Sequence, residues 1–219
     1  VENVAGGVQI NDKAAATAST APPGDHYYGT FYFSLEQQKR FEEIYVKTNQ
    51  WDMAFSGIKN VNISANNGED SNNFGSGNRA RGWVAVVEQS FEELSEVPEK
   101  LRKITNRTGV HMDGHGDFGD GLGWVLYDFM GLTVRNGDVE DSHVAYALGE
   151  GLSLADSSIL RPRTLLLQTA NGNIAKIKMI SLYKDLFHAE EWFRKSPSPY
   201  FTFEYVLIPK GETQFIIKP

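Results

Sequence analysis

The alternation of apolar and polar residues is the strongest pattern along this chain. A period of two is typical of a β-strand that buries one face and leaves the opposite face partly exposed to solvent. Seven runs show it: residues 28–35, 51–55, 83–88, 124–129, 164–170, 173–182 and 200–208. Runs of this length separated by turn residues predict a mainly β fold. We expect a single antiparallel domain of two packed sheets, or a partly closed barrel, with one or two short helices.

Two of these runs flank Asn171-Gly172, a dipeptide that favours the two positive-φ positions of a type I′ hairpin turn. A two-residue loop would pair Leu166 with Ile177. This register predicts a core face made of Leu166, Ala175, Ile177 and Met179, and an opposite face made of Lys176, Lys178, Leu165 and Leu167.

The remaining segments are less regular. Residues 184–196 (KDLFHAEEWFRKS) have the spacing of a short amphipathic helix, whereas Pro98 breaks residues 91–101 into an irregular acidic segment. Residues 64–82 form a polar loop with four glycines that is too long to be a simple connection. Residues 1–24 are poor in large apolar side chains, so we expect a flexible tether with one extended piece at residues 8–10, followed by the domain at residues 25–219.

Composition excludes several functional classes. The chain of 219 residues has no cysteine, which rules out disulfides and thiolate metal sites. A net charge of −7 disfavours nucleic acid as a partner, and no apolar run approaches the ~20 residues of a membrane span. The sequence also lacks G-x-S-x-G, H-E-x-x-H and a phosphate-binding glycine loop. We therefore expect a binding protein and not an enzyme.

Residues 111–123 (HMDGHGDFGDGLG) are the most unusual stretch, because they combine two histidines, a methionine, three aspartates and five glycines. Asp113, Asp117 and Asp120 are candidate ligands for calcium. Their spacing of four and three residues, without a distal glutamate, does not match an EF-hand loop. Histidine and methionine are axial ligands of haem iron, which makes haem the better hypothesis for this stretch.

Four blocks of the sequence resemble the HmuY family, the haem-binding lipoproteins of anaerobic Gram-negative bacteria. The blocks, in chain order, are residues 27–35 (YYGTFYFSL), 51–55 (WDMAF), 163–183 (with TANGNIAKIKMISLY) and 201–209 (FTFEYVLIP). The resemblance implies the two-sheet fold of that family. These blocks are scaffold, so they support the fold more firmly than the ligand.

The resemblance also implies candidate ligands for haem. Met130-Gly131, six residues after Gly123-Trp124, resembles the family segment in which a ligand precedes a glycine, and Asp113-Gly114-His115 resembles the other ligand's Asp-Gly-His. Met130 and His115 are therefore the first candidates as iron ligands, and we expect at least one methionine ligand if haem binds. Because the spacings differ from the founding member, Met112, His143 and His111 stay open, and another alignment places the second position near Asp156, which is no haem ligand.

The function implied by the resemblance is capture of haem outside the cell and its transfer to an outer-membrane haem transporter, as part of iron acquisition. The family also implies an acylated cysteine upstream of Val1, and thus an outer-membrane-anchored or secreted protein at the cell surface. The alternative is a binding or adhesion module that keeps the scaffold without haem and recognises a glycan or a protein. The polar loop at residues 64–82 motivates that alternative. The oligomeric state does not follow from the sequence.

Overall fold

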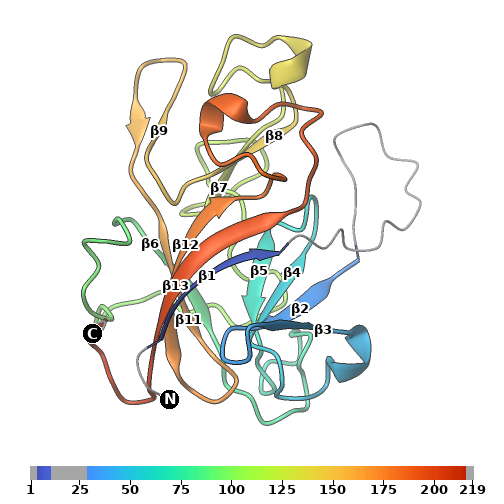
Figure 1. Cartoon of the computed structure of the whole chain (residues 1–219), viewed down its shortest axis with the longest axis vertical. Coiled ribbons are helices and arrows are strands. Elements are labelled where there is room, and N and C mark those ends of the chain that lie inside the picture. Colours follow the sequence, from blue (N-terminus) through green and yellow to red (C-terminus); the bar gives the residue numbers. More distant parts are fainter. Residues whose placement is uncertain (1–3, 11–28, 216–219) are drawn as a thin grey trace.

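A computed structural model of the chain describes residues 4–10 and 29–215, and these residues are almost entirely β (Figure 1). The only helices among them are three single turns of 3-10 helix: η1 (Glu43–Tyr45), η2 (Val139–Asp141) and η3 (Ala189–Glu191). The strands are β1 (Val4–Ile10), β2 (Phe31–Ser34), β3 (Lys39–Phe41), β4 (Met53–Ser56), β5 (Asn62–Ala65), β6 (Val84–Val87), β7 (Val125–Asp128), β8 (Val144–Ala147), β9 (Leu152–Ser153), β10 (Ile159–Leu160), β11 (Thr164–Gln168), β12 (Ile174–Ser181) and β13 (Phe201–Ile208).

The strands form two main antiparallel sheets, which confirms the mainly β, two-sheet prediction. One sheet has the order β1-β13-β12-β11-β6 and the other the order β3-β2-β4-β5. Strands β7 and β8 form a separate hairpin in the upper half of Figure 1, and β9 pairs with β10 beside it. The sheets do not close into a barrel. All seven predicted strands are present.

The two main sheets pack through aromatic side chains. Phe201 of β13 lies with its ring centroid 4.4 Å from that of Phe55, and Phe203 lies 5.8 Å from Phe33. These positions alternate with half-exposed residues along β13, so one face of the strand is core and the other borders solvent. Trp124 joins the same core and donates its indole N–H to the carbonyl of Val61 at 2.7 Å. The core is thus continuous from the two sheets to the start of β7.

The register of the β11–β12 hairpin differs by one residue from the prediction. Leu165 faces Ile177, and Leu166 faces Lys176. A one-residue slip turns every side chain of a strand to the other face. Leu165 and Leu167 therefore belong to the main core with Ile177, while Leu166 lies on the opposite face in a smaller apolar cluster. The prediction that Leu166 shares the main core face was wrong, and so was the placement of Leu165 and Leu167.

The physical reason for the shift is the loop length. Thr169 donates its backbone N–H to Asn173 O at 2.8 Å, so three residues and not two lie in the loop. Gly172 has a φ of +93°, whereas Asn171 does not have a positive φ. This is the three-residue hairpin in which a glycine occupies the left-handed position. The Thr169 hydroxyl also accepts a hydrogen bond from Asn173 N and holds the loop closed.

Residues 184–196 do not form the predicted amphipathic helix. They contain only η3, which is one 3-10 turn. Glu191 accepts hydrogen bonds from the backbone of Phe187 and His188, and the Trp192 ring packs 5.7 Å from that of Tyr183. Burial of Trp192 against the core thus fixes an irregular backbone. Residues 91–101 are irregular, as expected.

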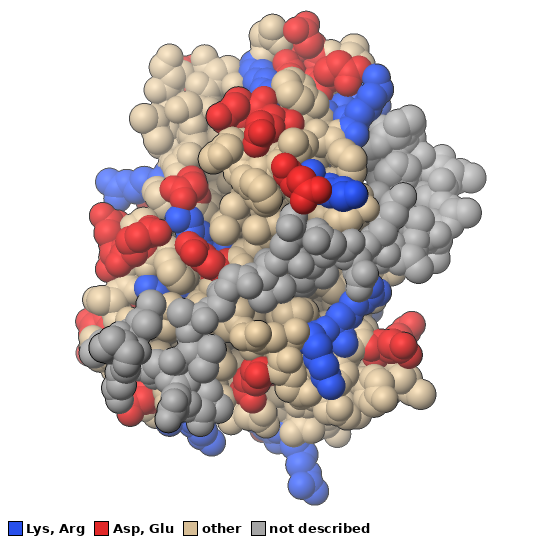
Figure 2. Space-filling view, viewed as in Figure 1, with Lys and Arg blue, Asp and Glu red and all other residues tan. Residues whose placement is uncertain are grey.

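At the N-terminal end, the predicted extended piece at residues 8–10 is part of β1, which pairs with β13. Residues 4–7, predicted as part of the tether, belong to the same strand. The other residues of the predicted tether, 1–3 and 11–24, lie outside the described residues. On the face shown in Figure 2, acidic and basic side chains are interspersed. None of the described helical turns is long and apolar enough to span a lipid bilayer.

Candidate functional site

Asp113 organises the loop at residues 111–123. Its side chain is 1% exposed, and its Oδ1 lies 2.6 Å from His115 Nδ1. The same Oδ1 accepts the backbone N–H of His115, and Oδ2 accepts that of Gly123 at 3.0 Å. The Asp113 backbone in turn donates to Val125 O, at the start of β7. One carboxylate therefore ties both ends of the loop to the first strand of the β7–β8 hairpin.

The electrostatics of Asp113 favour its charged form. Burial acts to raise its pKa, but hydrogen bonds from Gly123 and His115, together with the nearby Arg163 charge, outweigh burial and hold the pKa below its ordinary value. The Arg163 guanidinium, itself 1% exposed, lies 3.5 Å from Asp113 and 2.9 Å from Glu88. A carboxylate in this setting is a permanent acceptor for the imidazole beside it.

This arrangement gives His115 a defined orientation. With Nδ1 directed at Asp113, the ring's Nε2 points away from the carboxylate and makes no hydrogen bond within residues 4–10 and 29–215. The side chain is 58% exposed. A carboxylate that fixes one nitrogen of a histidine and leaves the other outward is the usual outer-shell arrangement of a metal-binding histidine.

The loop segment that follows His115 is bonded to the end of β7 that precedes Met130. Asp117 Oδ2 accepts the backbone N–H of Phe129 at 2.8 Å, and Asp117 N donates to Tyr127 O at 2.7 Å. His115 precedes Asp117 by two residues, and Met130 follows Phe129 by one. Two predicted ligand positions that are fifteen residues apart in sequence thus lie on segments joined by direct hydrogen bonds.

Exposed apolar side chains gather at this end of the hairpin. Met130 is 57% exposed and Phe118 68% exposed, and the Phe118 ring lies 5.5 Å from that of Phe129. Leu132 and Val139 are also more than half exposed. Single exposed apolar residues are ordinary, but several of them from neighbouring segments are typical of a binding surface. We call Phe118, Met130, Leu132 and Val139 the apolar rim.

The other predicted ligand positions are less suited to iron. Met112 is buried in the main core next to Val125. His143 packs its ring 4.5 Å from Phe129, and its Nδ1 lies 3.1 Å from the Tyr127 hydroxyl. His111 pairs through Nε2 with Asp120. The His143 ring therefore contacts Phe129 and Tyr127. Met112 lies beside the start of β7.

The loop also corrects one expectation about shape. Ligation by Met130 inside the fold requires a haem-sized slot between Trp124 and residues 111–123. Instead the loop packs directly on its neighbours: a Cβ atom at Gly123 would lie 2.3 Å from Asp113 N, and one at Gly116 would lie 2.7 Å from Tyr127 O. Trp124 is fully buried beneath. Any ligand of His115 must therefore lie on the outer side of the loop.

Each of the three aspartates of the loop has a different partner. Asp113 holds His115, Asp117 holds the Phe129 backbone, and Asp120 lies beside His111. No group of three His, Cys, Asp or Glu side chains suited to a metal ion occurs in the part of the chain that the structure describes.

Sequence reasoning missed two features of this site. The Asp-Gly-His motif was noted, but the role of Asp113 in orienting His115 was not; an acidic residue two positions before a histidine in a glycine-rich loop is the available signal. Phe118 was also missed, although a lone aromatic residue among aspartates and glycines is unusual.

Comparisons with known proteins give distant similarities only. No protein-family model matches the chain, and no curated protein matches it by sequence. Among solved structures, the apo HmuY analog of Tannerella forsythia aligns with a TM-score of 0.44 at 11% identity, over 96% of this chain and 98% of that chain. A candidate lipoprotein of Bacteroides fragilis aligns with a TM-score of 0.36 at 13% identity, over 92% of this chain and 89% of that chain.

Proposed function

We propose that this chain binds haem at the cell surface, using His115 and Met130 as its iron ligands, and delivers it to an outer-membrane transporter. The observation that carries the proposal is the Asp113–His115 pair. A buried carboxylate fixes one imidazole nitrogen and leaves the other exposed. The sequence blocks that resemble the HmuY family support the same function.

The residues at this site fit the chemistry of haem. Iron in haem takes imidazole or thioether ligands, and the macrocycle is a flat apolar plate. His115 offers an imidazole, Met130 offers a thioether, and Phe118 offers an exposed aromatic ring. The structure does not describe a closed pocket around them, so haem would rest against the outer side of the loop. Partial exposure suits a protein that must release its cargo to another protein.

Methionine ligation has a consequence for redox state. A thioether is a neutral, soft ligand, and its coordination raises the reduction potential of haem. We therefore expect reduced haem to bind more tightly than ferric haem. A transport function would use this difference where the surroundings are reducing.

The experiment is a titration of the protein with ferric haem and with dithionite-reduced haem, followed by the Soret band. The proposal predicts saturable binding in both states, with the lower Kd for reduced haem. A flat titration in both states would contradict it and leave the alternative, a binding module without haem.

A further inference from the structure

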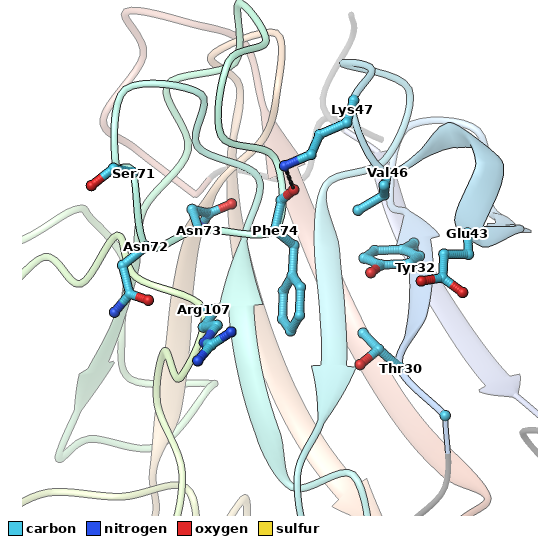
Figure 3. A pocket seen from close by; sticks show the side chains of 11 residues that line it. Thr30, Tyr32, Glu43, Val46, Lys47, Ser71, Asn72, Asn73, Phe74 and Arg107 are labelled. Atoms are coloured by element: carbon cyan, nitrogen blue, oxygen red, sulfur yellow. Dashed lines mark hydrogen bonds between the residues drawn. The ribbon is translucent and has the colours of Figure 1, made fainter. Parts of the chain in front are cut away.

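A cavity is lined by residues that all lie outside the loop at residues 111–123. It has a volume of about 500 Å³ and lies between the β2–η1 region and the polar loop at residues 64–82 (Figure 3). This volume is within the ordinary range for small-molecule sites. Its walls contain no histidine, methionine or cysteine, so its chemistry differs from that of the His115 loop.

The wall formed by the polar loop is rigidly built. Asn66, Asn67 and Asn73 turn their side chains inward, where they are buried and bonded to backbone groups. Asn78 adds a bond to the Asn66 side chain at 2.8 Å. Networks of satisfied buried amides fix one conformation. The loop therefore presents its outward side chains in set positions before any ligand arrives, which lowers the entropic cost of binding.

Two aromatic rings form the centre of the cavity. Phe74 projects from the loop toward Tyr32 of β2, with ring centroids 6.0 Å apart in an edge-to-face arrangement (Figure 3). Lys47 crosses between the walls and donates its Nζ to Phe74 O at 2.9 Å. Phe74 is partly exposed, so part of its ring faces the cavity. The electron-rich face of such a ring attracts the polarised C–H bonds of a sugar.

The Tyr32 hydroxyl is an unusual group in this setting. Tyr32 is only 3% exposed, yet its hydroxyl has no hydrogen-bond partner among residues 4–10 and 29–215. Burial, with a contribution from the Glu43 charge, raises the pKa of Tyr32 to about 12, so the hydroxyl stays protonated. The hydroxyl oxygen is not one of the fully buried unpaired atoms of the described residues, so it is open to the cavity, where a polar ligand can hydrogen-bond it.

Further polar groups around the cavity are unused by the protein. The side chains of Ser71, Asn72 and Arg107 make no hydrogen bond to the described residues. Arg107 and Lys47 carry two positive charges against the single carboxylate of Glu43. A guanidinium fork matches a carboxylate in two parallel hydrogen bonds, and an amide, a hydroxyl and a carboxylate suit sugar hydroxyls.

From these groups we infer that the cavity binds a carboxylated sugar, with Arg107 on the carboxylate and the Phe74 ring against an apolar face of the sugar. The Tyr32 hydroxyl and Asn72 amide hydrogen-bond the ring substituents. The class includes sialic and hexuronic acids at the ends of glycans. This site is separate from the haem site, so the protein would hold two ligands of different chemistry.

The test is saturation-transfer NMR and calorimetry with N-acetylneuraminic acid and with glucuronic acid, beside glucose and acetate as probes of the sugar and carboxylate parts alone. At least one acidic sugar should bind more than tenfold better than either part. Arg107→Gln and Tyr32→Phe should each weaken that binding at least about fivefold. Arg161→Gln, which changes an exposed arginine outside the cavity, should leave it unchanged.

Several results would overturn the inference. They are binding of neither acidic sugar, equal binding of acetate or glucose, or an Arg107→Gln protein that binds like the parent. Tyr32→Phe keeps the ring and its packing, so a loss there with unchanged thermal stability reports on the ligand and not on folding. Sugar binding should also persist in His115→Ala, which separates this site from the proposed haem site.

Discussion

The Oδ1 atom of Asp113 lies 2.6 Å from Nδ1 of His115, and the aspartate is buried while the histidine is exposed. The contact couples the interior of the loop to its surface. The buried partner is also bonded to the Gly123 backbone, so it cannot follow the imidazole if the ring moves. His115 is thereby held in one orientation.

Asp113→Asn should both loosen the loop and weaken haem binding. An amide carries no charge, and one of its two polar atoms is a donor that faces other donors. We expect a loss of about 1–3 kcal/mol in the free energy of unfolding, measured by urea denaturation. If His115 binds iron, haem affinity should fall about 10- to 100-fold, as for other outer-shell partners. Asp120→Asn is the matched control, because Asp120 is an exposed aspartate of the same loop. Equal stability of the two variants would contradict this role of Asp113.

Asp52 should make stability depend on pH in the acid range. It is buried and accepts hydrogen bonds from Ser34, Leu35 and Ala170. Burial outweighs these bonds and raises its pKa from 3.8 to about 6. The folded protein therefore binds a proton on Asp52 more tightly than the unfolded chain does.

The sign of the effect follows from that difference. This contribution to stability is fully present below pH 3.8 and is lost as the pH rises to about 6, with a total on the order of 3 kcal/mol. The measurement is denaturation of the parent and of Asp52→Asn at several pH values from 4 to 7. As the pH rises, the free energy of unfolding of the parent should fall relative to that of Asp52→Asn. A difference that stays constant would show that Asp52 titrates alike in both states.

The hairpin turn should be sensitive to substitution at Gly172 and tolerant at Asn171. Gly172 has φ +93°, and a Cβ there would lie 3.0 Å from Lys210 Cδ, so Gly172→Ala should cost about 1–3 kcal/mol. Asn171→Ala should cost less than about 1 kcal/mol, because Asn171 lacks a positive φ and loses only an exposed bond to Glu36. Chemical denaturation of both variants measures the contrast. Equal large losses would instead indicate the two-residue type I′ turn.

Which face of β12 is buried can be tested at Ile177, in the middle of the strand. Ile177 is fully buried between the sheets, so Ile177→Ala should lower the free energy of unfolding by about 2–5 kcal/mol. Ile159→Ala removes the same atoms from an exposed position and should cost less than about half a kcal/mol. If the two variants unfold at the same denaturant concentration, Ile177 is not a core residue.

The sequence was informative where a pattern is local. Alternation located every predicted strand, because each strand buries one face. Alternation did not predict the hairpin register. Hydrogen bonds of the Thr169 hydroxyl and backbone to Asn173 make the loop one residue longer, and the pattern of apolar positions carries no information about those bonds. The helix expected at residues 184–196 failed for a similar reason, since tertiary burial of Trp192 overrides local spacing.

The candidate site was predictable in part. The composition of residues 111–123 singled out this loop, and the structure joins it through Asp117 to Phe129, the neighbour of Met130. The sequence could not show that Met112 is core while Met130 is exposed, because burial depends on the partner strand. The cavity around Tyr32 and Arg107 could not be predicted from the sequence, since its residues come from four separate segments.

The most direct test of the proposed function is a titration of reduced haem into the parent and into His115→Ala, Met130→Ala and His188→Ala. His188 is an exposed histidine outside this site and serves as the control. The proposal predicts a saturable Soret shift for the parent and for His188→Ala, with at least a tenfold increase in Kd for both His115→Ala and Met130→Ala. Binding by all four proteins with the same Kd, or by none of them, would contradict it.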